Sequence, residues 1–243
     1  MARGKYGTYV PVTAGEKKER SLRPIVKICG LMRADDIQMC VRHGADIIGF
    51  VADYPRQVPW DIGAQAAGEL IQCVSKPAQT CIVTGGKVEK IIKLALETEP
   101  DYIQLHFNET LGDTVYIVRE LKKKGIKVIK TLFPGTPDIE EAAKKFSQTG
   151  IYALLLDHRT PGNAVTGGAA DLLLYRKIRE SVNLPIILAG GITPENVNEI
   201  LLHSEAPFID LMTGVESSPG VKDEAKMNAL FAALECTDQS LTS

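Results

Sequence analysis

An eightfold alternation of short apolar runs and longer stretches with helical spacing limits most strongly what this chain can fold into. The apolar runs occupy residues 25–29, 46–51, 80–84, 102–106, 127–133, 152–157, 185–190 and 208–214. The stretches with helical spacing occupy residues 34–44, 61–72, 87–97, 114–125, 137–146, 170–180, 194–203 and 222–235. Eight strand–helix pairs in roughly 220 residues predict a (β/α)8 TIM barrel. A doubly wound open sheet is the main alternative.

The chain is expected to form a single domain with a short N-terminal extension. Its 243 residues, 44% of them hydrophobic, can bury a large core, and no linker divides them. Residues 25–243 are assigned to the barrel. Residues 1–24 are rich in basic residues and glycine, so they are interpreted as a flexible or surface-hugging tail without a chemical role.

Charge and hydropathy exclude two classes of macromolecular partner. The formal net charge is -2, which does not provide the basic face that binds a nucleic-acid backbone. Apolar runs stay shorter than the roughly 18 residues of a membrane helix, and the N-terminus lacks the apolar core of a signal peptide. We therefore expect neither nucleic acid nor membrane as a partner.

Cysteine and histidine spacing indicates neither disulfides nor a metal. The five cysteines are odd in number and never form a C-x-x-C pair, which favours a reducing, cytoplasmic location. The four histidines, His43, His106, His158 and His203, lack a recognisable ligand spacing. No metal site is expected.

Two chemically active residues end predicted strands. Cys29 ends the first apolar run and Asp157 ends the sixth. Active sites of such barrels lie at the C-terminal ends of the strands, so both side chains are expected at one rim. Each residue also has a simpler interpretation, because a cysteine at a strand end is usually a small buried hydrophobe and an aspartate is common in turns.

Glycine loops follow the last two predicted strands. Gly190 and Gly191 come after the seventh strand, before an expected helix start at Thr193-Pro194, and Thr213-Gly214 comes after the eighth. Glycine allows backbone N–H groups to approach an anion, and these two loops form the usual phosphate site of such barrels. The sequence therefore predicts a small phosphorylated ligand.

Eight sequence motifs occur in order along the chain. They are KICGL (27–31), Asp35-Asp36, GADIIGFV (44–51), PRQV (55–58), DYIQLH (101–106), LLLD (154–157), LAGGITPENV (188–197) and TGVESSPGVKD (213–223). Together these motifs resemble the phosphoribosylanthranilate isomerase family of tryptophan biosynthesis. The resemblance runs in order from about residue 25 to 235. It implies a (β/α)8 barrel that needs neither a metal nor an organic cofactor, and we expect a monomer or a homodimer.

The resemblance also implies a reaction and a role for each candidate residue. The family performs an Amadori rearrangement of N-(5-phosphoribosyl)anthranilate to 1-(2-carboxyphenylamino)-1-deoxyribulose 5-phosphate. By resemblance Asp157 is the general acid and Cys29 the general base, Arg56 holds the anthranilate carboxylate, and Asp210 faces the substrate. Asp210 alone could equally be a buried structural carboxylate. The phosphate residues would be Gly190, Gly191, Thr213 and Gly214.

The loops depart from the family pattern at four places. Phe107 stands where a glycine usually follows QLH, and Thr84-Gly85-Gly86 replaces a segment that usually holds an asparagine nearby. ADYPR (52–56) lacks the usual serine before the proline, and residues 158–173 lack the family's lysine and both aromatics. Two alternatives therefore stay open: an isomerase of a different phosphorylated aminosugar, or a non-catalytic barrel that binds a phosphorylated ligand.

Overall fold

Eight parallel strands close into a barrel within residues 23–157 and 171–240, which the computed structural model describes. The strands are β1 (Ile25–Ile28), β2 (Ile47–Val51), β3 (Gln79–Thr84), β4 (Tyr102–Leu105), β5 (Lys127–Leu132), β6 (Ala153–Asp157), β7 (Ile186–Ala189) and β8 (Phe208–Leu211). Each strand pairs with the next in sequence, and β1 pairs with β8 to close the ring. The predicted (β/α)8 barrel is confirmed, and the open sheet is excluded.

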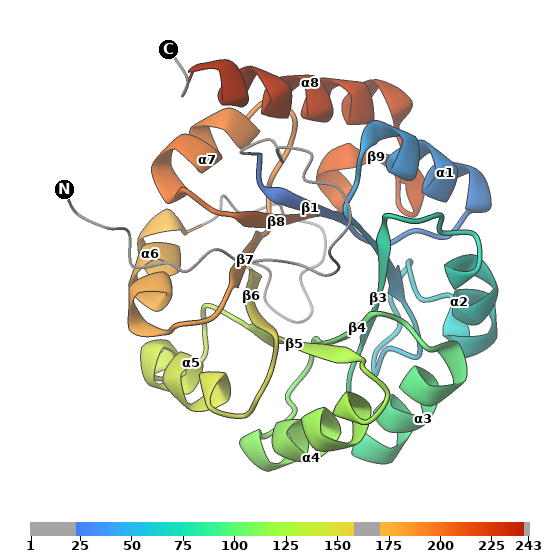
Figure 1. Ribbon diagram of the computed structural model, residues 1–243, viewed down its shortest axis with the longest axis vertical. Coiled ribbons are helices and arrows are strands. Elements are labelled where there is room, and N and C mark those ends of the chain that lie inside the picture. Colours follow the sequence, from blue (N-terminus) through green and yellow to red (C-terminus); the bar gives the residue numbers. More distant parts are fainter. Residues whose placement is uncertain (1–22, 158–170, 241–243) are drawn as a thin grey trace.

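The helices surround this ring and cover its outer face (Figure 1). They are α1 (Ala34–His43), α2 (Gly63–Ile71), α3 (Val88–Thr98), α4 (Leu111–Lys122), α5 (Ile139–Ser147), α6 (Leu172–Ser181), α7 (Val197–Ser204) and α8 (Glu224–Ser240). Because every strand points the same way, the loop after each strand opens at the same end of the barrel. That end is where the candidate residues were predicted. None of the helices in the described part of the chain is both long and apolar enough to cross a membrane.

Apolar side chains fill both faces of the barrel wall. Alternate strand residues, such as Ile47, Ile129 and Leu155, form a cluster inside the ring, and the others pack against the helices. This division follows from the two-residue period of a strand, whose successive side chains point to opposite faces. The interior is therefore a packed core, and a ligand can reach the barrel only from its ends.

The predicted N-terminal extension lies outside the described residues except for Arg23 and Pro24. Arg23 is joined to the barrel, because its guanidinium donates to the Asp46 carboxylate at 2.8 Å and to the Gly44 carbonyl at 2.9 Å. The boundary between extension and barrel remains a prediction.

Two helix starts differ by three residues or more from the sequence-based expectation. Helix α4 begins at Leu111, ahead of the expected residue 114, because Thr110 caps it: the Thr110 hydroxyl accepts from the Asp113 N–H, and the Asp113 carboxylate accepts from the Thr110 N–H. Helix α7 begins at Val197 rather than at Thr193-Pro194. The intervening residues 194–196 form a turn instead.

A short irregular segment between β8 and α8 was not predicted. It contains a 3-10 helix, η1 (Thr213–Val215), followed by the small antiparallel pair β9 (Glu216–Ser218) and β10 (Val221–Lys222). These elements are too short to show a hydrophobic period, so pattern analysis does not detect them. Long-range contacts of Glu216 and Lys222 hold the segment in place, as described below.

Candidate active site

Cys29 follows β1 and lies at the rim of the barrel, where its side chain is 5% exposed. Its N–H donates to the Leu211 carbonyl at 2.8 Å, which ties it to the end of β8. Gly49 on β2 faces the thiol, and a Cβ atom there would lie 3.0 Å from Cys29 Sγ. Glycine at position 49 therefore leaves room for the Cys29 side chain.

Lys27 supplies a positive charge beside this thiol. Its fully buried ammonium donates to Asp210 Oδ2 at 2.8 Å, because Lys27 on β1 and Asp210 on β8 lie opposite each other in the strand pairing. Burial lowers the pKa of Lys27, but the Asp210 carboxylate and the neighbouring thiols together raise it by more than burial lowers it. The pKa of Lys27 therefore lies above its ordinary value. Lys27 stays charged. Asp210, predicted to face the substrate, thus has one carboxylate oxygen engaged in an internal ion pair.

A second buried lysine reaches Cys29 from the segment after β8. Lys222 on β10 donates to the Cys29 carbonyl at 2.6 Å and to Glu216 at 2.7 Å. Glu216 also accepts from the Trp60 indole N–H at 3.2 Å, and Asp36 accepts from the Lys222 backbone N–H at 3.1 Å. These contacts fix the strand end that carries Cys29. Asp36 and Lys222 lie within motifs that carry the family resemblance, but the sequence alone predicted no role for either.

The pKa of the Cys29 thiol is raised overall. Burial is the largest cause, since it penalises the charged thiolate, while Lys27 and Lys222 act in the opposite direction. A lowered pKa would favour a base that reacts as the thiolate, whereas in this structure the net direction is the reverse. The two cations moderate the penalty of burial without overcoming it.

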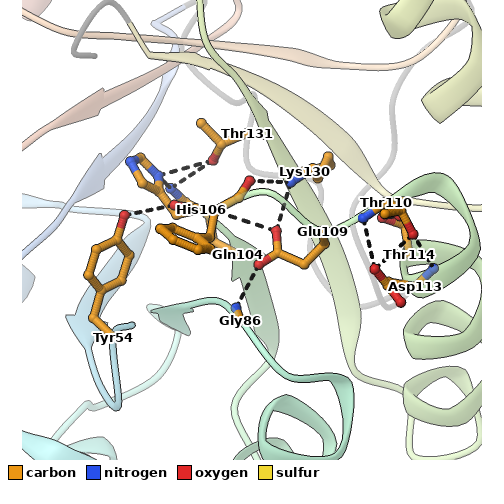
Figure 2. A network of polar contacts seen from close by, with 11 residues as sticks. Tyr54, Gly86, Gln104, His106, Glu109, Thr110, Asp113, Thr114, Lys130 and Thr131 are labelled. Atoms are coloured by element: carbon orange, nitrogen blue, oxygen red, sulfur yellow. Dashed lines mark hydrogen bonds and ion pairs between the residues drawn. The ribbon is translucent and has the colours of Figure 1, made fainter. Parts of the chain in front are cut away.

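Asp157 is the last residue of β6 and is 1% exposed. His106, which follows β4, places its Nε2 atom 3.3 Å from Asp157 Oδ2. The other ring nitrogen, Nδ1, lies 3.1 Å from both the Gln104 amide nitrogen and the Thr131 hydroxyl (Figure 2). An amide nitrogen can only donate, so Nδ1 accepts and Nε2 carries the proton toward Asp157.

Sequence reasoning considered His106 only as a metal ligand and missed this contact. The available signal was its place at the end of an apolar strand run, the same signal that identified Asp157. Among the residues described here, no group of three histidine, cysteine or acidic side chains could hold a metal ion.

Arg56 lies on the loop after β2, and its side chain is exposed. Its guanidinium carbon lies 5.2 Å from the centre of the Phe107 ring, which comes from the loop after β4. Residues 158–170, which make up most of the segment after β6 that departs from the family pattern, lie outside the described residues.

The two glycine loops pack directly against each other. Gly190 and Gly191 have φ angles of 97° and 67°, left-handed values that favour glycine. Asn196 holds this loop by donating to the Gly191 carbonyl and accepting from the Thr193 N–H, both at 2.8 Å. A Cβ atom at Gly214 would overlap the carbonyl oxygen of Ile192. Gly214 is therefore required for the packing of the loops, whatever they bind. Thr213, beside it in η1, is exposed.

The structure thus brings Cys29, Asp157 and both glycine loops to the C-terminal end of one parallel barrel. Arg56 and Asp210 belong to the same half of the molecule, the first on a loop above the strands and the second inside the wall. Such an arrangement defines a class of protein, the (β/α)8-barrel enzymes that act on small molecules at this end.

Comparison with known proteins identifies the family within that class. The family model of N-(5'-phosphoribosyl)anthranilate isomerase matches residues 26–233. The isomerase of Methanosarcina acetivorans is 33% identical over 229 residues, which cover 87% of this chain and 93% of that protein. The chain belongs to the N-(5'-phosphoribosyl)anthranilate isomerase family, whose reaction is a step of tryptophan biosynthesis.

Solved structures of the family share the fold. The crystal structure of the enzyme from Thermus thermophilus superposes with a TM-score of 0.73 at 30% identity, over 87% of this chain and 98% of that one. Another phosphoribosylanthranilate isomerase was crystallised with reduced 1-(o-carboxyphenylamino)-1-deoxyribulose 5-phosphate. It gives a TM-score of 0.72 at 25% identity, over 88% of this chain and 99% of that one.

Proposed function

We propose that this protein converts N-(5-phosphoribosyl)anthranilate to 1-(2-carboxyphenylamino)-1-deoxyribulose 5-phosphate at the C-terminal end of its barrel. The observation that carries the proposal is the meeting of a carboxyl group, a thiol and two glycine loops at one end, at the termini of β6, β1, β7 and β8. Each feature answers one requirement of the reaction: a proton donor, a proton acceptor and a seat for the phosphate.

Asp157 acts as the general acid. Opening the ribose ring requires a proton on the ring oxygen, and the resulting Schiff base has an acidified proton on C2. The contact between Asp157 and His106 Nε2 supports this role, because it orients the carboxyl group at the end of β6, where the substrate is expected to bind. Protonated Asp157 delivers the first proton.

Cys29 acts as the general base that removes the C2 proton, giving an enolamine that relaxes to the ketone. The reacting form is the thiolate. Lys27 and Lys222 support this role, since both lower the pKa of Cys29 against the effect of burial. When the pKa of a thiol is raised, only a small fraction of it is ionised at neutral pH, but the thiolate that does form is a stronger base.

The remaining candidate residues bind the two ends of the substrate. Arg56 receives the anthranilate carboxylate, for which a planar guanidinium fork is suited. Gly190, Gly191, Thr213 and Gly214 receive the phosphate, and the left-handed backbone at positions 190 and 191 supports this assignment. Asp210 holds the Lys27 ammonium beside the thiol, and its carboxylate also faces the substrate.

The proposal includes neither a metal nor an organic cofactor, because one acid and one base complete the rearrangement. A reducing cytoplasm is the proposed location, which the free thiols of Cys29, Cys40, Cys73 and Cys81 support. The proposed assembly is a monomer or a homodimer. Turnover that survives dialysis against a chelator would agree with a reaction that needs no metal. Loss of turnover that a divalent metal restores would contradict it.

Turnover of phosphoribosylanthranilate, followed by loss of its fluorescence, tests the function directly. Cys29→Ser and Asp157→Asn should each lower kcat by about a hundredfold or more, while Arg56→Ala should mainly raise KM. Near-normal turnover in a folded Cys29→Ser protein would refute the role of the thiol. An inactive wild-type protein that still binds inorganic phosphate at the glycine loops would instead favour a non-catalytic barrel.

A further inference from the structure

The exposed Arg56 side chain lies against an aromatic ring that the loop after β4 contributes. Its guanidinium carbon is 5.2 Å from the centre of the half-buried Phe107 ring. An exposed arginine samples many rotamers, and the negative face of a ring attracts the guanidinium and limits that freedom. Phe107 is therefore placed to select among the positions that Arg56 can adopt.

Tyr54 joins the two loops that carry this pair. It precedes Arg56 on the loop after β2, and its hydroxyl donates to the His106 carbonyl at 2.8 Å (Figure 2). The Tyr54 ring also meets the Phe107 ring edge-on, with centres 6.3 Å apart. The loop after β2 is thus fastened to the residues on which Arg56 rests.

A buried ion pair fixes the backbone of Phe107. Lys130 and Glu109 are 2.7 Å apart with side-chain exposures of 3% and 0%. Lys130 donates to the Phe107 carbonyl at 2.9 Å, and Glu109 accepts from the Phe107 N–H at 3.3 Å. Glu109 also accepts from the Gly86 N–H at 2.9 Å, which adds the loop after β3 to the network (Figure 2). Three loops and β5 therefore hold one residue in place.

Gly85 is matched to this arrangement. A Cβ atom at position 85 would lie 2.5 Å from Phe107 Cβ and 2.8 Å from Glu109 Oε1. The backbone there is not in the left-handed region, so space rather than conformation requires glycine. Two of the departures from the family pattern, the glycine at 85 and the phenylalanine at 107, therefore form one complementary pair.

We propose that Phe107 is a positioning residue that holds the guanidinium of Arg56 for the anthranilate carboxylate. This inference rests on the proposed function, in which Arg56 binds that carboxylate. Phe107 acts through Arg56, so its removal affects substrate binding and leaves the proton transfers of Asp157 and Cys29 intact. The buried pair of Glu109 and Lys130 serves the same purpose from behind the ring.

Steady-state kinetics with phosphoribosylanthranilate test the inference. Phe107→Leu keeps an apolar side chain and removes the ring face, and it should raise KM about two- to fivefold with kcat unchanged. Phe107→Tyr retains the ring, so this variant should keep the wild-type KM. The matched control is Tyr116→Leu, which removes the ring under Arg119 on the outer surface of α4 and should leave both constants unchanged.

A double-mutant cycle separates positioning from a structural role. In an Arg56→Ala background, Phe107→Leu should no longer change KM, because the side chain that it positions is gone. The inference would be overturned if Phe107→Leu raised KM equally in the wild-type and Arg56→Ala proteins. It would also be overturned if Phe107→Leu did not raise KM in the wild-type protein. An inactive wild-type protein would reject the proposed function together with this inference, whereas an active one with additive effects would reject the inference alone.

Discussion

Replacing Lys27 with methionine tests how the barrel supports the candidate base. Methionine has a similar length but no charge, so the substitution leaves Asp210 buried without its ammonium partner. It also removes a cation that lowers the pKa of Cys29. Two separate quantities should respond: the free energy of unfolding and the pH dependence of turnover.

The expected loss of stability follows from the burial of the pair. Lys27 is 0% and Asp210 8% exposed, and removing one partner of a buried pair costs about 3–5 kcal/mol. For a chain of this size each kcal/mol shifts the unfolding midpoint by about 2–4 °C. The product is a decrease of about 6–20 °C, measurable by calorimetry or circular dichroism.

The pH dependence should shift in a known direction. Turnover that needs the thiolate rises with pH toward the pKa of Cys29. Without Lys27 this pKa increases further, so the rising limb of kcat/KM should move to higher pH. The control is Lys130→Met, which breaks a similarly buried pair on the outer side of the wall and should lose comparable stability without moving that limb. A folded Lys27→Met protein with an unmoved limb would refute the coupling of Lys27 to Cys29.

Three further substitutions probe a helix cap, a loop and the candidate acid. Thr110→Ala should cost about 1 kcal/mol. Hydrogen bonds from Thr110 lower the pKa of Asp113, so their contribution to stability is present above the ordinary carboxyl pKa and disappears in acid. The unfolding curves of the wild type and the variant should therefore differ at neutral pH and converge at acidic pH. Gly214→Ala should destabilise the protein by about 1–3 kcal/mol and raise KM, since the added methyl overlaps a backbone carbonyl. His106→Gln should lower kcat by up to about a hundredfold with little change in KM, because Asp157 loses its orienting partner.

Local sequence patterns predicted the fold well because barrel strands carry a strong local signal. The runs beginning at Ile25 and Tyr102 are short, apolar and followed by polar loops, so their boundaries lie within a residue or two of the observed strands. The start of α4 was placed too late because the cap at Thr110 and Asp113 precedes the first apolar residue of the periodic pattern. The hairpin of β9 and β10 was missed because distant partners hold it.

Candidate site residues at strand ends could be found in the same way, but their electrostatic settings could not. The position of Cys29 follows from the end of a strand run. Its burial, and the approach of Lys222 across 193 positions of sequence, depend on the tertiary fold. His106 carried the same positional signal as Asp157, yet its contact with Asp157 joins β4 and β6 across the rim.

Burial sets the direction of the Cys29 pKa, and the two cations that oppose it are themselves paired with carboxylates. Lys27 lies 2.8 Å from Asp210, and Lys222 lies 2.7 Å from Glu216. The Asp210 carboxylate raises the pKa of the thiol and so cancels part of the effect of Lys27. Burial then dominates, and the pKa rises. The carboxylates cannot simply be removed, because an unpaired buried ammonium would carry its own desolvation cost. The paired lysines thus keep the barrel wall stable, while the pKa of the Cys29 thiol stays raised. At neutral pH only a small fraction of the molecules hold the thiolate, and in those molecules the thiolate is a strong base.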